Sequence, residues 1–589
     1  MRLTARRGRP GDVTNEEVAR VFDAVADLLE IKGESVYRVL SYRRAAESIR
    51  AQGRRLTDLQ SEGRLKEIPG VGDAIAAKIE ELLTTGRLGF YENLADEVPP
   101  GLIDVLKVGG VGPKKAARFW RELGVTNLAE LEAAARDGRL RELSGMGAKS
   151  EATILKNIER LASRETARVS LGVALPTAES LTARLRALPG VVAAEPAGSV
   201  RRRKETVGDL DLLVGAGDPA DVLRRFVAFE DVERVLGQGE TKASVELVGG
   251  LRAQLWVHPP ERYGSALQYA TGSQSHNVQL REWALDRGYS LSEHGLKSAG
   301  GEEVRCPEES EVYRVLGLPW IPPELREGLG EIQDAARGAL PALVEETDVR
   351  GEMHAHSDWS DGGATVAAMA EAALARGLEY LVISDHSQSL GVVNGLSPER
   401  LRKQRAEIDR VQRRLGNELR LLHGAEVEIL ADGTLDFDDT VLSGLDVVIA
   451  AIHLSLRQPR EMMMTRLLNA IRNPHVDVVG HPTGRMIGSR EASDLDMEAV
   501  FSAAADHGVA LEINAHPARL DLGDSLARRA WQVGCLVCIN TDAHVPGDFD
   551  LRRYGVGVAR RAGLPAEAIL NTRSAASLQA WLDTRGGRA

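Results

Sequence analysis

The chain has 589 residues, which is too long for one hydrophobic core and predicts three or four domains. Its 43% hydrophobic and 27% charged content is ordinary for a soluble globular protein. No apolar run approaches the roughly 18 residues needed to cross a bilayer, and the N-terminus lacks the apolar segment of a signal peptide. Three cysteines cannot form a disulfide framework. These features favour a cytoplasmic protein without a membrane partner.

Charge is distributed unevenly along the chain. Residues 1–330 carry 47 basic and 49 acidic side chains, and residues 331–589 carry 27 and 37. Within the first part, residues 101–204 carry 19 basic and 11 acidic side chains. Ten of the thirteen histidines follow residue 350. A basic segment beside an acidic, histidine-rich one predicts a polyanion-binding region joined to a metal-binding region.

Residues 14–163 are predicted to be helical, with one glycine pattern that recurs. IPGVG (68–72), VGGVG (108–112) and LSGMG (143–147) each open an amphipathic helix. Two glycines permit a tight turn whose backbone N–H groups can hold a phosphate oxygen, which predicts helix–hairpin–helix turns that bind the DNA backbone without reading its sequence. The glycines are Gly70, Gly72, Gly110, Gly112, Gly145 and Gly147. A role in helix packing alone would explain one copy better than three.

A second pattern lies in residues 165–320, where short β-like runs mix with helices. GDLDLLV (208–214) places Asp209 and Asp211 on one strand face, where they could bridge two divalent metals. GSVRRRK (198–204) offers a small residue, a hydroxyl and three arginines, a set that suits a triphosphate. Residues 321–349 are predicted to be a linker that is partly helical.

From residue 351, short apolar runs alternate with helical segments, which predicts βα units around a parallel sheet or barrel. Imidazoles and carboxylates recur where these runs end. They are His354, His356, Asp361, His386, Glu426, His453, His481, Asp542 and His544. A single histidine would be explained well enough by a core hydrogen bond. A set of nine predicts one multi-metal hydrolase site, because the carboxyl ends of barrel strands converge and buried carboxylates need cations.

Together these ligands resemble the polymerase-and-histidinol-phosphatase (PHP) domain. RYGSALQYATGSQSHNVQLR (262–281) and EVYRVLGLPWIPPELRE (311–327) resemble bacterial family X DNA polymerases, in which a PHP domain follows the polymerase core. The implied fold is multidomain α plus α/β, with helix–hairpin–helix modules, a nucleotidyltransferase palm and thumb, and a TIM-like β/α barrel. The implied segments are a lyase-like helical domain (1–95), a fingers-like domain (96–165), a palm (166–258), a thumb (259–320), a linker (321–349) and the PHP domain (350–589).

The resemblance also implies how metals are shared. One metal would be held by His354, His356, Glu426 and Asp542, a second by Asp361, His386 and His544, and a third by Glu426, His453 and His481. Mixed nitrogen and oxygen ligation suits Zn²⁺, Mn²⁺ or Fe²⁺ more than Mg²⁺, and we expect Zn²⁺ or Mn²⁺ here. Asp209 and Asp211 would hold Mg²⁺ or Mn²⁺.

The polymerase core has implied binding residues as well. Ser199 and Arg202 would bind the triphosphate of an incoming dNTP. Tyr269 and Gly272 would line its sugar pocket, while Asn277 and Arg281 would contact the DNA minor groove. The implied partner is gapped or nicked duplex DNA, bound by a monomer.

Lys78 aligns with the Schiff-base lysine of deoxyribose-phosphate lyases, and Arg38 and Tyr42 would lie near a 5′-phosphate. The alternative for Lys78 is an ordinary solvated lysine on a helix.

Two departures from the family pattern bear on polymerisation. The third catalytic aspartate is replaced by Gln254, which cannot deprotonate a primer 3′-hydroxyl. If Gly249 and Gly250 form a two-residue hairpin loop, Glu246 pairs with Ala253 and faces away from Gln254, so it would not substitute. Ala270 stands where the family usually has Phe beside the sugar.

Three functions are therefore weighed. The leading hypothesis is a DNA-repair enzyme that combines gap filling with 3′→5′ phosphodiester hydrolysis by the PHP domain. In the second, the polymerase core serves mainly to bind DNA and only the PHP nuclease is active. The third is a small-molecule phosphatase, which leaves three phosphate-binding turns without a purpose.

Overall fold

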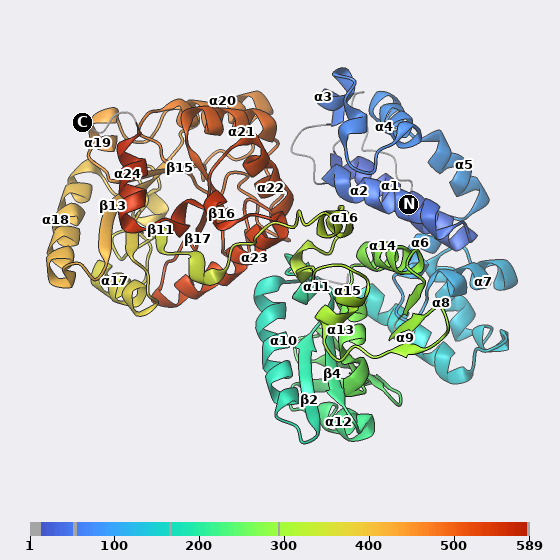
Figure 1. Ribbon diagram of the computed structural model, residues 1–589. Coiled ribbons are helices and arrows are strands. Elements are labelled where there is room, and N and C mark those ends of the chain that lie inside the picture. Colours follow the sequence, from blue (N-terminus) through green and yellow to red (C-terminus); the bar gives the residue numbers. More distant parts are fainter. Residues whose placement is uncertain (1–12, 14, 51–55, 164–167, 293–294, 586–589) are drawn as a thin grey trace. The chain divides into compact units, whose positions relative to one another are not determined.

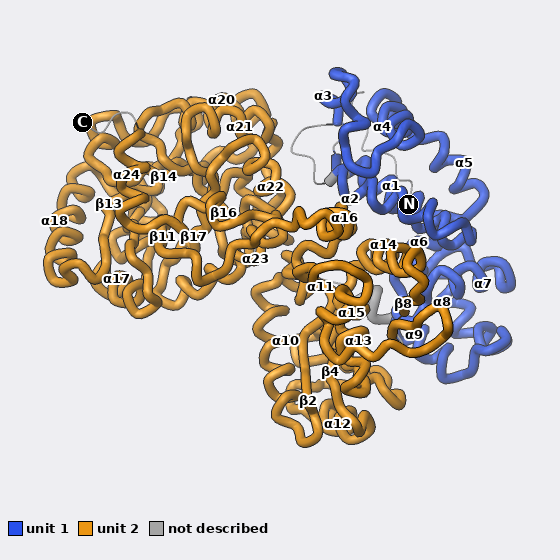
Figure 2. Tube along the Cα trace, viewed as in Figure 1, with its two compact units in different colours: residues 1–167 blue, residues 168–589 orange. Residues whose placement is uncertain are grey.

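The structure is a computed structural model that describes residues 13, 15–50, 56–163, 168–292 and 295–585. The chain separates into two compact units, residues 1–167 and 168–589 (Figure 2). Within the described residues, no helix has the length and apolar character needed to cross a membrane.

Unit 1 is helical in its described part, as the sequence predicts. Its helices are α1 (Asn15–Lys32), α2 (Val36–Arg50), α3 (Leu56–Ser61), α4 (Asp73–Thr85), α5 (Gly89–Glu97), α6 (Leu102–Leu106), α7 (Pro113–Leu123), α8 (Leu128–Arg136) and α9 (Ala148–Ser163). The amphipathic helices bury one continuous apolar core, which includes Phe22, Ile79 and Phe119.

The three glycine turns of unit 1 share one geometry. In each, the residue between the two glycines donates its backbone N–H to the carbonyl three positions earlier, at 2.9–3.0 Å. The first glycines, Gly70, Gly110 and Gly145, have φ of 79°, 84° and 77°, a region that a side chain disfavours. The second glycine directly precedes α4, α7 or α9. Each turn therefore presents a helix N-terminus, with its free N–H groups.

Unit 2 begins with the palm–thumb region (residues 168–327), built around a five-stranded sheet of order β2-β4-β7-β6-β5. Its strands are β1 (Val169–Ser170), β2 (Val191–Pro196), β3 (Thr206–Val207), β4 (Asp209–Ala216), β5 (Val232–Gln238), β6 (Lys242–Leu247), β7 (Arg252–His258), β8 (Tyr289–Ser292), β9 (Gly295–Ser298) and β10 (Glu303–Val304). Its helices are α10 (Leu171–Arg186), α11 (Gly198–Arg201), α12 (Pro219–Phe226), α13 (Tyr263–Thr271), α14 (Gln274–Leu285) and α15 (Glu309–Val315). The central pair, β4 and β7, is parallel, so the ends of both strands reach the same edge.

The segment expected to be a partly helical linker contains α16 (Glu331–Ala336) and two short 3₁₀ turns, Pro323–Leu325 and Glu346–Asp348. These short helical elements agree with the helical part of the expectation, while the role of the segment as a linker stays a prediction.

The barrel region (residues 350–585) holds seven parallel strands in sequence order. They are β11 (Gly351–Ala355), β12 (Tyr380–Ile383), β13 (Arg420–Glu428), β14 (Val447–Ala451), β15 (Val478–Val479), β16 (Ala510–Asn514) and β17 (Val537–Asn540). The helices are α17 (Val366–Ala375), α18 (Pro398–Leu415), α19 (Asp439–Leu442), α20 (Arg460–Arg472), α21 (Met497–His507), α22 (Asp524–Val533), α23 (Arg552–Ala562) and α24 (Ala575–Asp583). Figure 1 shows α17, α18, α20 and α22 around the outside of these strands.

The first strand, β11, meets the segment that follows the last strand, β17, through a parallel bridge between Ala355 and Ala543. His356 also donates its backbone N–H to the Ala543 carbonyl at 2.8 Å. The sheet is therefore nearly closed, which confirms the predicted TIM-like β/α barrel. The strand ends that carry the predicted ligands all lie at the same end of the barrel, which is called its mouth below.

Candidate metal centre and polymerase site

The structure places all nine predicted ligands at the carboxyl ends of the barrel strands. His354 lies within β11 and Glu426 within β13, and the other seven lie in the segments that follow strand ends. The strands that bring them together are almost wholly buried, so the backbone that carries the ligands is fixed by packing.

Among the described residues, three groups of ligand atoms lie close enough to hold a metal, with the atoms of each group within 4.8 Å of one another. The groups are His356, Asp361, His386 and His544; His354, His356 and Asp542; and His386, Glu426 and His453. His481 joins this centre through Nε2, 2.9 Å from Glu426 Oε1. His356 and His386 each belong to two groups, whereas the resemblance gives each of them to one metal.

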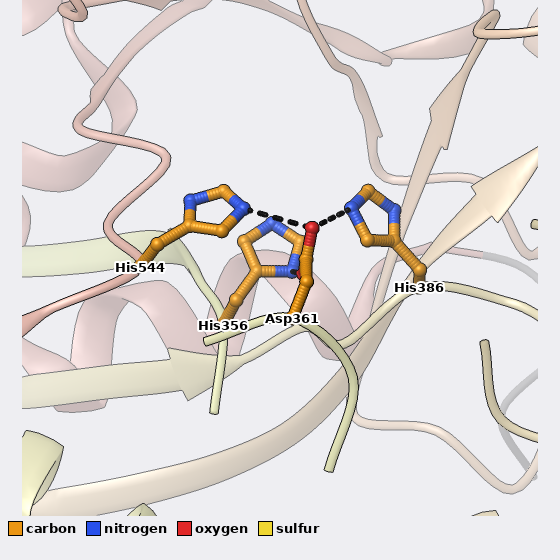
Figure 3. A group of neighbouring side chains, drawn as sticks. All are labelled: His356, Asp361, His386 and His544. Carbon is orange, nitrogen blue, oxygen red and sulfur yellow. Dashed lines mark ion pairs between the residues drawn. The ribbon is translucent and has the colours of Figure 1, made fainter. Parts of the chain in front are cut away.

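Asp361 is the carboxylate at the centre of the first group (Figure 3). Its Oδ2 lies 3.4 Å from His544 Nε2 and 3.5 Å from His386 Nε2. The His356 ring lies 4.3 Å from the His544 ring and 4.5 Å from the His386 ring, measured between centroids. Three imidazoles thus surround one carboxylate.

Several of these buried atoms make no hydrogen bond within the protein. They are Nε2 of His354 and Nδ1 of His356 and His481, whereas Nδ1 of His386 lies 2.9 Å from Oε2 of Glu426. A buried polar atom without a partner costs about 1–3 kcal/mol. A cation among them would bind the imidazole lone pairs and the carboxylate together, so the donor set fits divalent metals.

The charges of the cluster keep its carboxylates ionised. Burial alone would lower the pKa of His354, but Glu512, Glu426 and Asp542 raise it well above its usual value. Burial would raise the pKa of Glu426 and Asp542, yet the facing histidines hold both well below the usual range. Both carboxylates are therefore negatively charged at neutral pH, which metal binding requires.

Two further carboxylates, not indicated by the motifs, orient the ligand histidines. Glu512 Oε1 lies 2.8 Å from His354 Nδ1, and Glu428 Oε2 lies 2.9 Å from His453 Nδ1. Each of these contacts fixes the imidazole so that its Nε2 faces Glu426, where it could bind a metal. The signal was present in the sequence: ALEIN (510–514) places Glu512 in a mostly apolar run, and AEVE (425–428) carries Glu428 two residues after the ligand Glu426.

In the palm, Asp209 and Asp211 on β4 lie opposite Arg252 and Gln254 on β7. Gln254 Nε2 donates to Asp209 Oδ2 at 2.6 Å. Burial and the charge of Asp209 raise the pKa of Asp211 to about 7. The two carboxylates share one strand face, as predicted.

Gly198, at the start of α11, has φ of 58°, and a Cβ atom there would lie 2.2 Å from Asp211 Oδ2. Only glycine allows α11, which carries Ser199, to approach Asp211 so closely.

The predicted position of Glu246 is wrong. β6 and β7 pair Glu246 with Arg252 and Ser244 with Gln254, one residue out of the expected register. Because a one-residue shift reverses the face, Glu246 lies on the same face as Gln254. The Glu246 carboxylate accepts a hydrogen bond from Arg234 on the outer strand β5. Strand β7 lies between β6, which carries Glu246, and β4, which carries the two aspartates. Glu246 therefore does not take the place of the missing aspartate. The sequence predicted this because of an opposite strand face, whereas the structure shows that distance from β4 is the reason.

The predicted nucleotide residues come together around the end of α13. Arg202 Nη1 donates to the Thr271 carbonyl at 2.5 Å, and a Cβ atom on Gly272 would lie 3.1 Å from the same nitrogen. Asn277 Nδ2 donates to the Tyr269 carbonyl at 2.8 Å.

Arg281, one turn further along α14, extends this group. Its guanidinium lies 5.4 Å from the centroid of the Tyr269 ring. The helix α14 therefore carries both residues that the resemblance assigns to the minor groove.

In unit 1, the three residues predicted for a lyase site surround Phe90. The Tyr42 ring stacks on Phe90 with centroids 5.8 Å apart, and Lys78 Nζ lies 5.0 Å from the Phe90 centroid. The Arg38 guanidinium lies 5.5 Å from the same ring. Lys78 is exposed and donates to the Ala74 carbonyl at 3.1 Å. Phe90, on α5, was not indicated by any motif.

Comparison with known proteins agrees with this geometry. The chain is 36% identical to the DNA polymerase/3′-5′ exonuclease PolX of Bacillus subtilis (strain 168) over 570 residues, 96% of this chain and 99% of the relative. The chain belongs to the bacterial family X DNA polymerases with a PHP domain. DNA polymerase lambda of Rattus norvegicus is 26% identical over 343 residues, 53% of this chain and 56% of the relative.

Four family models match the parts of this family X chain. They are a helix-hairpin-helix domain (13–88), a SAM-like helix-hairpin-helix tandem (102–160), the DNA polymerase beta thumb (266–327) and the PHP domain (352–516). A probable phosphatase of Thermoanaerobacter sp. (strain X514) is 29% identical over 221 residues, 35% of this chain. Asp542 and His544 lie beyond the matched PHP segment but belong to the same cluster.

Proposed function

We propose that this family X enzyme fills short gaps in duplex DNA with its palm and shortens 3′ ends by hydrolysis in its PHP barrel. The observation that carries the proposal is the pairing, in one chain, of two carboxylates beside a nucleotide pocket with a nine-ligand barrel mouth. The name of the Bacillus relative joins the same two activities. The protein acts as a monomer on gapped or nicked DNA.

The barrel would hold two or three divalent cations, Zn²⁺ or Mn²⁺, in the three ligand groups. Bound there, such cations supply a water with a lowered pKa and stabilise charge on the phosphate oxygens. Glu512 and Glu428 orient the imidazoles of His354 and His453 toward the mouth. Because the barrel region is acidic, the helix–hairpin–helix turns of unit 1 would supply most of the DNA binding.

In the palm, Asp209 and Asp211 would hold Mg²⁺ or Mn²⁺ beside the triphosphate. Gln254 offers a neutral carbonyl, but it cannot accept the proton of a primer 3′-hydroxyl. We therefore propose slow synthesis that Mn²⁺ supports better than Mg²⁺. A lyase reaction through Lys78 is proposed on the geometry around Phe90.

A second candidate, favoured by the hydrogen bond from Gln254 to Asp209, is a palm that only binds DNA. The small-molecule phosphatase alternative accounts for the barrel alone and leaves the thumb and the helix–hairpin–helix modules without a purpose.

A 5′-labelled gapped duplex with Mn²⁺, with and without dNTPs, separates the first two functions. Extension that Asp209→Ala abolishes supports gap filling. If the duplex is extended neither with Mn²⁺ nor with Mg²⁺, the palm serves only to bind DNA.

A further inference from the structure

Arg202, which the family resemblance places at the triphosphate, is held from several sides within unit 2. Its Nη1 donates to the Thr271 carbonyl, and its Nε donates to Glu327 Oε1 at 3.2 Å. Burial and Asp209 raise the pKa of Asp211, and Arg202 lies near enough to oppose that rise.

Arg561, on helix α23 of the barrel, reaches Arg202 by two routes. Its Nη1 donates to the Arg202 backbone carbonyl at 2.7 Å and to Glu327 Oε1 at 2.8 Å. Its Nε and Nη2 both reach Asp524 Oδ2, at 2.8 and 2.7 Å. Asp524 on α22 therefore fixes the planar guanidinium of Arg561, and Arg561 in turn fixes both the backbone and the side-chain partner of Arg202.

Glu327 joins the two arginines. Only 8% of its side chain is exposed, and its carboxylate also lies 3.7 Å from Lys204 Nζ. Burial would raise its pKa, but Arg561 and Arg202 hold the pKa at about 2. Glu327 is thus ionised at any physiological pH. Removing either Glu327 or Arg561 would leave a buried charge uncompensated and would allow the Arg202 side chain to move.

We infer that Arg561 of the PHP barrel is a positioning residue for the nucleotide pocket of the palm, acting through Glu327 and the Arg202 carbonyl. This inference rests on the proposed nucleotide site. A residue of the barrel would then contribute to the affinity of the palm for dNTP.

The test uses the full-length protein and two readouts. One is the Kd for dCTP with Mn²⁺, measured by calorimetry. The other is the rate at which a 5′-labelled duplex is shortened, which depends on the barrel mouth. Arg561→Met and Glu327→Gln should each raise the Kd about tenfold or more, because small displacements of a binding group are costly. Shortening should stay within about twofold of wild type, because the substituted residues are not ligands of the mouth.

Arg553→Met is the matched control. Arg553 lies on the same helix and pairs with Glu179 of the palm–thumb region, so it crosses the same boundary, but its ion pair does not include Arg202. It should leave the Kd unchanged. Arg561→Lys keeps the charge without the planar fork and should still raise the Kd, which decides the matter if Arg561→Met does not fold.

A wild-type Kd in Arg561→Lys and Glu327→Gln would overturn the inference while leaving the nucleotide site intact. An equal loss of dCTP affinity in Arg553→Met would also overturn the inference, because it would show that any disturbed contact between the barrel region and the palm–thumb region weakens binding. If the wild-type protein does not bind dCTP with Mn²⁺, the proposed nucleotide site fails, and the inference fails with it.

Discussion

Gln254 donates a hydrogen bond to Asp209, across the parallel pair β4 and β7, at 2.6 Å. An aspartate in the same place would repel Asp209 and would need a metal between them. The glutamine therefore stabilises the metal-free palm, and it leaves β7 without a carboxylate that could accept a proton at this position.

Gln254→Asp should convert this palm into a faster polymerase. A positioned general base contributes about 10²–10⁴-fold, so extension of a gapped duplex with Mg²⁺ should rise at least tenfold in single-turnover assays. Asp209→Ala in the same background is the control and should abolish the gain. An unchanged extension rate would mean that Gln254 does not limit synthesis.

Glu512→Gln should weaken metal binding in the barrel. The amide keeps the size of the side chain but loses the charge that orients His354, and such changes typically cost about 10–100-fold in metal affinity. The concentration of Mn²⁺ that gives half-maximal shortening measures the effect. Glu498→Gln, which breaks an ion pair with Arg529 between helices, is the control. Equal Mn²⁺ dependence in both variants would contradict the role of Glu512.

His423 should make the barrel sensitive to acid. Burial and the charge of Arg405 lower its pKa from 6.5 to about 4. The unfolded chain therefore binds more protons between these values, so the free energy of unfolding falls as the pH drops through this range.

Between pH 8 and pH 5, wild type should lose about 2 kcal/mol relative to His423→Gln, since each pKa unit corresponds to about 1.4 kcal/mol. Urea unfolding of both proteins at the two pH values measures the difference, and other titrating groups cancel in the comparison. A difference that does not change with pH would contradict the assignment.

Lys78→Ala should abolish covalent trapping of an abasic-site oligonucleotide by borohydride, because the Schiff base needs that amine. Lys66→Ala, in the same unit and paired with Asp73, is the control. Abasic-site cleavage that remains in Lys78→Ala would belong to the barrel metals. Undiminished trapping in that variant would place the Schiff base on another amine.

Much of the barrel site could be predicted because its residues follow a regular pattern. Each ligand stands at a strand end, and the parallel topology brings those ends together whatever the detailed packing. The sequence does not reveal which ligands share a metal. His356 and His386 each belong to two groups, and the positions of their side chains depend on how the residues around the mouth pack.

Other features depended on contacts that the local sequence does not encode. The position of Glu246 was wrong because the β6–β7 turn, not the strand pattern, sets the register. Phe90 reaches Lys78 from a separate helix, and Arg561 contacts Glu327 across 234 positions of sequence. Such pairs arise from tertiary packing.

The most direct test of the account is the shortening of a 5′-labelled gapped duplex by Asp542→Asn. Asp542 has φ of 55°, a conformation that asparagine also tolerates, so the substitution removes the charged ligand while keeping the backbone. Shortening with Mn²⁺ should fall more than about 100-fold, beyond the loss from an orienting residue, while DNA binding stays at the wild-type level. Shortening at the wild-type rate, in this variant and in His356→Ala, would contradict the assignment of hydrolysis to the barrel mouth.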